Sequence, residues 1–124
     1  SRELLMGSFE VTEHRVASDT PSTLGTQEAS GRYLATSATF AKTAHWRDGI
    51  ACSKWDLVTF YEPAPEDVSL SGLLPRGLTA GWAKLMCDGQ EVDRIFVVDG
   101  RRILSRTPNG ATWLVWSRSA WPEA

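Results

Sequence analysis

Side chains that could carry out acid–base or nucleophilic chemistry are few in this chain of 124 residues. The only histidines are His14 and His45, so a serine–histidine pair would have to use one of them. His14 falls on the polar side of an alternating segment, which is typical of a solvent-exposed position. Glu62, Glu66 and Asp67 lie in a proline-rich stretch and fit a solvated loop better than a general acid and base. None of these groups indicates catalysis.

The sequence also lacks the motifs of common enzyme classes. It contains no G-x-S-x-G, no G-x-G-x-x-G, no G-x-x-x-x-G-K-[ST] and no H-E-x-x-H. Its two cysteines and two histidines do not have the spacing of metal ligands. We therefore expect a protein that is not an enzyme and that has no catalytic residues, cofactor or metal site.

The densest group of functional side chains is His45-Trp46-Arg47, directly before an Asp-Gly turn signal. Ordinary turn chemistry explains such a group, but on a loop at the mouth of a barrel it would form a polar binding surface. Tryptophan and arginine are enriched among the residues that dominate protein interfaces. Together with Leu73 from the proline-rich stretch 62–77, these three residues are the candidate surface for a protein partner.

Cys52 and Cys87 are the only cysteines. Two buried free thiols and one disulfide both fit this pattern. A bridge that closes a loop of this length would stabilise the fold by about 4 kcal/mol in the chain-entropy model. Both cysteines are expected at strand ends beside turns, where a disulfide can be reached. We predict the disulfide, and with it a periplasmic or secreted protein whose signal peptide has been removed.

The composition is that of a folded globular protein, with 42% hydrophobic and 23% charged residues. The formal net charge of −2 provides no positive field for nucleic acid. No apolar run reaches the roughly 18–20 residues of a membrane helix. We expect a single domain over residues 1–124, monomeric, without a membrane span. Ten of the 13 basic residues are arginine, which suits either polar strand faces or recognition of a planar anion.

Alternating apolar and polar residues predict seven β-strands. They cover residues 7–16, 33–40, 55–61, 80–87, 93–98, 102–106 and 112–117. Asp-Gly or Asn-Gly pairs at 88–89, 99–100 and 109–110 are signals for hairpins that turn through positive φ angles. Residues 19–29 and 62–77 are predicted to be long connections.

Short strands in this number cannot leave two long edges unpaired in water, so closure into a barrel is expected. The predicted fold is all-β, a small antiparallel up-and-down β-barrel of seven to eight strands. Such a barrel holds either packed side chains or one small ligand. Large apolar residues that would line a ligand cavity, if they converge, are Phe9, Leu34, Trp46, Trp55, Trp82 and Trp113.

The order of these features resembles the lipocalin-like (calycin) barrels, in particular small exported bacterial proteins of this kind. Gly7-Ser8-Phe9 is similar to the first-strand G-x-W signature, with Phe in place of Trp. Gly31-Arg32-Tyr33-Leu34 at the start of a strand, the two cysteines and the run from 93 to 118 add to the resemblance. A META-domain-like interpretation fits the paired cysteines as well.

The resemblance implies binding rather than catalysis. Lipocalins often place a late arginine over the first-strand tryptophan, which implies a cation–π contact of Arg118 with Phe9 here. We expect a lipocalin-like binding protein for a small apolar or amphipathic ligand. The alternative is a partner-binding protein, such as a periplasmic inhibitor or an immunity-type protein, that uses loops on a solid barrel.

Overall fold

The computed structural model describes residues 2–17, 31–60, 72–74, 81–108 and 110–122. These residues form one sheet of nine antiparallel strands and two short 3-10 helices. The strands are β1 (Gly7–Val16), β2 (Ser37–Phe40), β3 (Ala44–Trp46), β4 (Ile50–Cys52), β5 (Trp55–Phe60), β6 (Gly81–Cys87), β7 (Gln90–Val97), β8 (Arg102–Arg106) and β9 (Thr112–Ala120). The 3-10 helices are η1 (Arg2–Leu4) and η2 (Arg47–Gly49).

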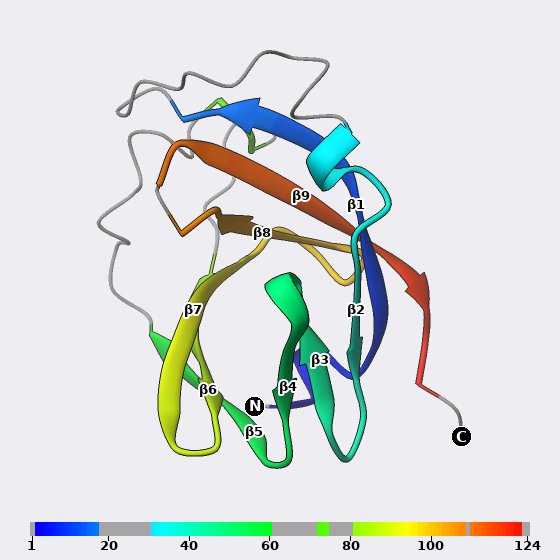
Figure 1. The fold of residues 1–124 in the computed structure, drawn as a ribbon, viewed down its shortest axis with the longest axis vertical. Helices are drawn as coiled ribbons and strands as arrows, with labels where there is room; N and C mark the ends of the chain where they lie inside the picture. Colours follow the sequence, from blue (N-terminus) through cyan, green and yellow to red (C-terminus); the bar gives the residue numbers. More distant parts are fainter. Residues whose placement is uncertain (1, 18–30, 61–71, 75–80, 109, 123–124) are drawn as a thin grey trace.

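The strands follow one another around a nearly closed barrel, in the order β4-β3-β2-β1-β9-β8-β7-β6-β5 (Figure 1). The first and last long strands, β1 and β9, pair along their length from Ser8 to Val16. The predicted fold class, an antiparallel all-β barrel, is confirmed. The strand count of nine is slightly higher than the predicted seven to eight.

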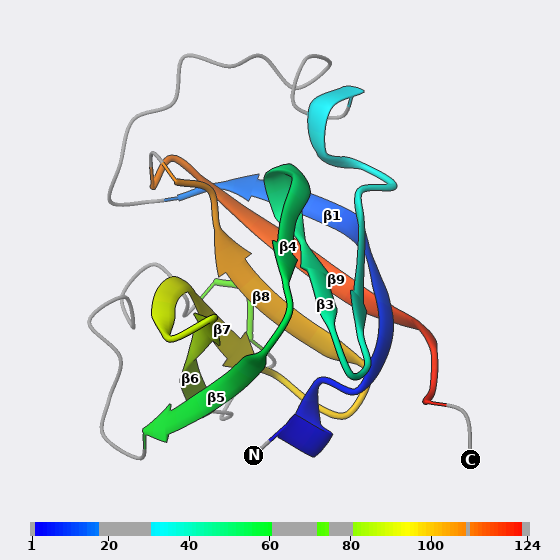
Figure 2. The ribbon, with the colours of Figure 1, turned by 60° about the horizontal axis from the view of Figure 1, so that its bottom comes forward.

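The additional strands arise where the chain bends. Because every neighbouring pair is antiparallel, β4 and β5 at the two ends of this order run in the same direction. Only Ser53 and Lys54 separate them, so β4 and β5 are two segments of one bent strand (Figure 2). The first segment pairs with β3 and the second with β6. Strands β3 and β4 have three residues each, which is too short for alternation to be recognised in a sequence.

Aromatic side chains fill the interior of the barrel. Trp46 stacks on Trp116 with ring centroids 4.5 Å apart. Phe40 contacts Trp55 at 4.9 Å and Phe9 at 6.3 Å. All five are almost fully buried in one cluster, so this part of the barrel is a packed core.

A second cluster lies on the outer face of the sheet. Trp82, Phe96 and Trp113 come from positions that alternate with the inward residues of β6, β7 and β9, and all three are buried. Phe60 stacks on Trp82 at 4.3 Å, and Leu73 packs against the same cluster. The sheet therefore buries apolar side chains on both faces at this place.

Arg118 lies at the end of the barrel where β1 begins. Its guanidinium lies 4.5 Å from the centre of the Phe9 ring, which confirms the cation–π contact that the resemblance implied. It also donates hydrogen bonds to the carbonyl oxygens of Met6, Leu4 and Gly100. A side chain at Gly7, where φ is +119°, would collide with this guanidinium and with the Ala120 carbonyl. Glycine at this position leaves room for the arginine side chain.

A register shift in β1 changes the position of His14. The shift between Val11 and Glu13 places His14 opposite Leu114, on the inner face of the sheet. His14 is half-buried, 6.3 Å from the ring of Tyr33. The expected position on the polar side of the strand is therefore wrong, because regular alternation does not anticipate a bulge.

Several boundaries and turns differ from the sequence prediction. The strand expected from residue 33 begins at Ser37, because residues 31–33 form a helical turn and Ala35 has a φ of +66°. Strand β7 begins at Gln90, directly after Asp88 and Gly89, whose φ angles are +50° and +86°. The latter pair confirms the first hairpin signal.

The turn at the second signal, Asp99-Gly100, forms without positive φ angles. Asp99 and Gly100 are not among the described residues with positive φ. Instead the carboxylate of Asp99 accepts the backbone N–H groups of Arg101 and Arg102 at 2.8 and 2.9 Å. Asn109 of the third signal, the connection at 19–29 and most of 62–77 lie outside the described residues.

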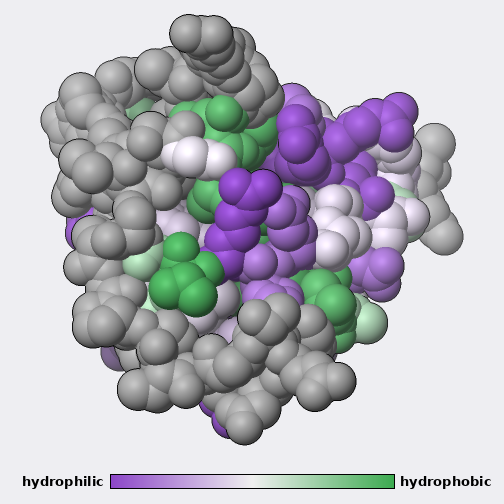
Figure 3. Space-filling view, turned by 90° about the horizontal axis from the view of Figure 1, so that it is seen from above, coloured by the Kyte–Doolittle hydropathy of each residue, from purple (hydrophilic) through white to green (hydrophobic). Residues whose placement is uncertain are grey.

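In the first part of β1, polar side chains lie on the outer surface of the barrel. In β1, exposed Glu10, Thr12 and Glu13 follow the buried Phe9 and Val11. Seen from above the view of Figure 1, hydrophilic side chains gather in the middle of the face and hydrophobic patches lie beside them (Figure 3). No helix among the described residues has the length and apolar character needed to cross a membrane.

Candidate functional site

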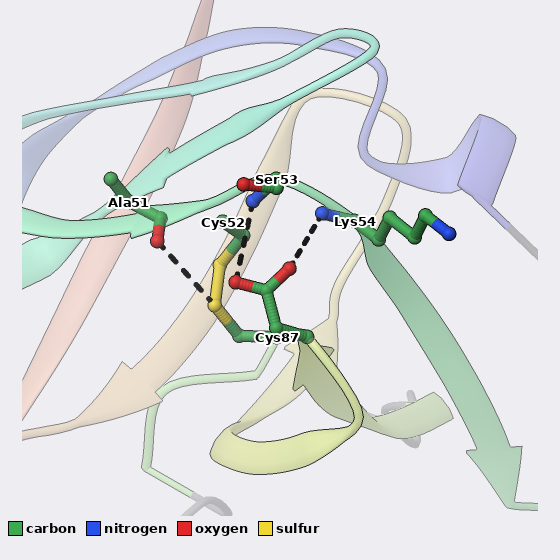
Figure 4. Close-up of a disulfide and its surroundings, with 6 residues drawn as sticks. Ala51, Cys52, Ser53, Lys54 and Cys87 are labelled. Carbon is green, nitrogen blue, oxygen red and sulfur yellow. Dashed lines mark hydrogen bonds between the residues drawn. A yellow bond between two sulfur atoms is a disulfide. The ribbon is translucent and has the colours of Figure 1, made fainter.

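Beside the bent strand, the β3–β4 hairpin faces β6 and β7 without pairing with them in the strand order. We call this junction the seam, and side chains link its two sides. A disulfide joins Cys52 at the end of β4 to Cys87 at the end of β6, with Cα atoms 5.2 Å apart, which confirms the predicted bridge (Figure 4). The Asp88 carboxylate accepts the backbone N–H groups of Lys54 at 2.8 Å and Ser53 at 3.4 Å. The Asp88 N–H in turn donates to the Lys54 carbonyl at 2.7 Å.

Asp93 of β7 makes a second link across the seam. One of its carboxylate oxygens accepts the indole N–H of Trp46 at 2.7 Å and the Nε–H of Arg47 at 2.6 Å. Arg47 also donates to the Val92 carbonyl at 3.3 Å. The Arg47 and Asp93 side chains are only 12% and 9% exposed. The hairpin that joins β3 to β4 is thus fixed to β7 by a buried ion pair.

Burial and hydrogen-bond partners have opposite effects on the pKa of Asp93. Burial raises the pKa of Asp93, because a carboxylate loses its hydration there. The Arg47 charge and the hydrogen bonds from Trp46, Arg47 and the Arg94 backbone favour the ionised form, but the pKa remains raised. Asp93 therefore takes up a proton more readily than an exposed aspartate does.

Two cavities adjoin this ion pair. The first, called the mouth cavity here, has a volume of about 280 Å³ and is lined by Arg32, Tyr33, Thr36, Arg47, Thr107, Pro108 and Leu114. The second, called the side cavity, has a volume of about 340 Å³ and is lined by Arg47, Glu91, Val92, Asp93, Arg94, Phe96, Arg106, Thr107 and Pro108. Arg47, Thr107 and Pro108 line both cavities and so lie between them.

The topology explains where the cavities lie. The mouth cavity lies where β1 and β8 end and where β2 and β9 begin, opposite the end at which Arg118 lies. The side cavity lies where β7 and β8 diverge, since these strands pair only at Phe96↔Leu104 and Val97↔Ile103. Cavities thus occur where the strand ladder is interrupted.

The mouth cavity combines apolar and polar walls with a cation. Tyr33 and Leu114 supply apolar surface, and Thr36 and Thr107 supply hydroxyl groups. The exposed Arg32 makes no hydrogen bond or ion pair with another described residue. This arrangement suits a small molecule with an anionic group and an apolar body. Among the described residues, no three His, Cys, Asp or Glu side chains converge as metal ligands would.

The six residues expected to line a ligand cavity do not converge on one. Phe9, Trp46 and Trp55 belong to the packed inner core. Trp82 and Trp113 belong to the cluster on the outer face, and Leu34 is 42% exposed. None of the six lines either cavity. The aromatic residues of this chain therefore act as core, and the cavities have other walls.

The residues expected to contact a protein partner are also separated. Trp46 is buried, so the expected presentation of its side chain on a loop is wrong. Arg47 is half-buried against Asp93, and Leu73 packs on the outer cluster. Of the four, only His45 is exposed.

Asp93 and the mouth-cavity residues other than Arg47 were not predicted as site residues from the sequence. Asp93 lies two and four residues before the inward-facing Ile95 and Val97, on the same face of the strand, so its inward position could have been recognised from the pattern. A charged residue in line with buried apolar residues signals a partner, since buried charges need compensation. Nothing in the local sequence identifies Arg47 as that partner.

No protein-family profile matches the chain, and comparisons with curated proteins and with solved structures gave no significant match. The features of the molecule that bear on its function are the two cavities and the Arg47–Asp93 ion pair beside them.

Proposed function

We propose that this protein binds a small amphipathic anion, such as a carboxylate with a short apolar body, in the mouth cavity and does no chemistry on it. The observation that carries the proposal is the position of Arg32 at the cavity wall, without a described partner and beside Tyr33 and Leu114. An arginine guanidinium binds planar anions through paired hydrogen bonds. The adjacent apolar surface would cover the body of the ligand.

The packed interior favours the mouth over the centre of the barrel as the site. The stack of Trp46 on Trp116 occupies the volume in which many barrels hold a ligand. The mouth cavity of about 280 Å³ lies near the lower limit of ligand sites, which suits a small molecule. A protein interface built on Trp46 and Leu73 is disfavoured, because Trp46 is buried and Leu73 packs against the cluster on the outer face of the sheet.

The proposal includes an exported, lipocalin-like protein. A disulfide persists in oxidising compartments, so the bridge between Cys52 and Cys87 supports a periplasmic or secreted location. The contact of Arg118 with Phe9 supports the lipocalin-like assignment. Expression with and without an export signal, followed by thiol titration of the purified protein, would test the location.

Calorimetric titration with decanoate, decanol and decyltrimethylammonium tests the ligand class. We expect decanoate to bind and the cationic amphiphile not to bind. Arg32→Gln should weaken decanoate binding by roughly tenfold or more, since hydrogen bonds to charged groups contribute about 1.5–3 kcal/mol. Arg101→Gln, an exposed arginine in the turn after β7, is the matched control and should bind like the wild type. Equal binding of all three amphiphiles, or no effect of Arg32→Gln, would refute the proposal.

A further inference from the structure

We infer that Arg47 is shared between Asp93 and the bound anion, so that anion binding is coupled to uptake of a proton by Asp93. This inference rests on the proposed function. It assigns to the Arg47–Asp93 pair a role in ligand affinity besides its role in closing the seam.

The position of Arg47 provides the first argument. Its side chain lines the mouth cavity, and the same guanidinium donates through Nε to Asp93 at 2.6 Å. An anion in the mouth cavity therefore competes with Asp93 for one cation. Of the two arginines at the mouth cavity, Arg32 is exposed to solvent and Arg47 is largely buried. Arg47 would therefore interact more strongly with an anion in the cavity.

The surroundings of Asp93 provide the second argument. Its side chain is 9% exposed, on the inner face of the sheet opposite Leu85 of β6. If Arg47 turns to a ligand, Trp46 and the Arg94 backbone still donate to the carboxyl group. A buried carboxylate without its counter-ion is strongly unfavourable, so protonation is the accessible way to leave it there. Burial already raises the pKa of Asp93 with Arg47 in place.

The balance of the step is simple. The carboxylate of Asp93 takes one proton from solvent, its ion pair with Arg47 breaks, and the Arg47 guanidinium pairs with the ligand anion. No covalent bond changes. Binding should then become tighter as the pH falls, by at most about tenfold for each pH unit in the range where free Asp93 is still ionised.

Other titratable groups near this position must be distinguished from Asp93. Glu91 and Arg94 on β7 and Arg106 on β8 line the side cavity with it. On the mouth side, His14 lies beside Tyr33. Of these, Glu91 carries a second carboxylate and His14 an imidazole. Glu91→Gln and His14→Gln are therefore the matched controls.

The test uses decanesulfonate, because its charge does not change between pH 4.5 and 8. Calorimetric titration of the wild-type protein in buffers of different ionisation enthalpy measures the protons taken up on binding. We expect net uptake approaching one proton, and an affinity that rises as the pH is lowered. Asp93→Asn should bind without proton uptake, independently of pH, and at least as tightly as the wild type at its acidic limit. The Glu91→Gln and His14→Gln variants should keep the pH dependence.

Each other outcome overturns the inference. Binding without proton uptake in the wild type would overturn the coupling while leaving the proposed function intact, and this readout needs no variant to fold. Unchanged pH dependence in Asp93→Asn, or its loss in His14→Gln, would assign the proton to another group. Failure of decanesulfonate to bind at any pH would refute the proposed function together with this inference.

Discussion

The barrel has two junctions of very different construction. At the first, β1 and β9 are joined by a hydrogen-bonded ladder from Ser8 to Val16. At the second, the seam beside the bent strand, the links are the disulfide, the Asp88 carboxylate and the Arg47–Asp93 ion pair. Both junctions bury apolar side chains beneath them.

The two junctions should therefore differ in how they respond to pH and to reducing agents. Backbone hydrogen bonds in a ladder do not titrate and are not reduced, so the β1–β9 junction should be indifferent to pH and redox conditions. The seam contains a reducible bond and a buried carboxylate whose pKa is raised by burial. Both cavities lie next to it, since Arg47 of the ion pair lines both.

The largest effect should follow loss of the disulfide. Replacing both cysteines, in Cys52→Ala with Cys87→Ala, should lower the free energy of unfolding by about 4 kcal/mol, since the bridge closes a long loop of the unfolded chain. Urea unfolding with and without a reducing agent measures this. The wild type should lose stability on reduction, whereas the double variant should not respond. A wild type that is insensitive to reduction would show that the seam does not depend on the bridge.

A smaller effect should follow loss of one indole N–H at the seam. In Trp46→Phe, Asp93 loses a hydrogen bond to a charged acceptor, which contributes about 1.5–3 kcal/mol. Trp116→Phe is the matched control, because its stacked indole donates to the neutral Ser105 hydroxyl at 3.0 Å. We expect the Trp46 variant to lose more stability in urea unfolding at pH 7. Equal losses would mean that the link to Asp93 adds nothing to the seam.

The pH dependence of stability should also differ between carboxylates. The pKa of Asp93 is raised in the folded protein, so the folded state binds a proton at a higher pH than the unfolded state does. From neutral pH down toward the unfolded value of 3.8, the wild type should therefore gain stability relative to Asp93→Asn. The gain is at most about 1.4 kcal/mol for each pH unit. Unfolding curves of both proteins at several pH values measure this difference.

Asp99 is a control for which the pH dependence of stability should have the opposite sign. The backbone N–H of Arg101, and then the side chain and N–H of Arg102, lower the pKa of Asp99. Its contribution to stability is present above pH 3.8 and lost as the pH falls through the lowered pKa. The wild type should thus lose stability relative to Asp99→Asn in strong acid. The same sign for both aspartates would contradict the assigned environments.

The fold was predictable where local pattern decides it. The bounds of β1 and β8 follow from alternation, and the first hairpin follows from Asp88-Gly89. The start of β2 was not predictable, because the positive φ of Ala35 depends on the surrounding structure rather than on residue type. A short strand such as β3 forms because it pairs with β2 and β4. Local residue propensity carries no information about such pairing.

The candidate site was harder to predict than the fold. Its residues come from four separated parts of the chain, and the one pairing that organises them joins positions far apart in sequence. Five of the six apolar residues expected at a ligand were instead divided between two cores, because the sheet buries both of its faces, and the sixth, Leu34, is exposed. Size and hydrophobicity identified buried residues, but they did not distinguish a packed core from a cavity wall.

Chemical-shift mapping with decanoate tests the central claim most directly, that the barrel mouth beside the seam binds amphipathic anions. Backbone amide signals of the ¹⁵N-labelled wild-type protein would be followed during the titration. We expect the largest shifts at Tyr33, Thr36, Thr107 and Leu114, which line the mouth cavity. Largest shifts at the opposite end, around Gly7 and Arg118, or no shifts at all, would contradict it.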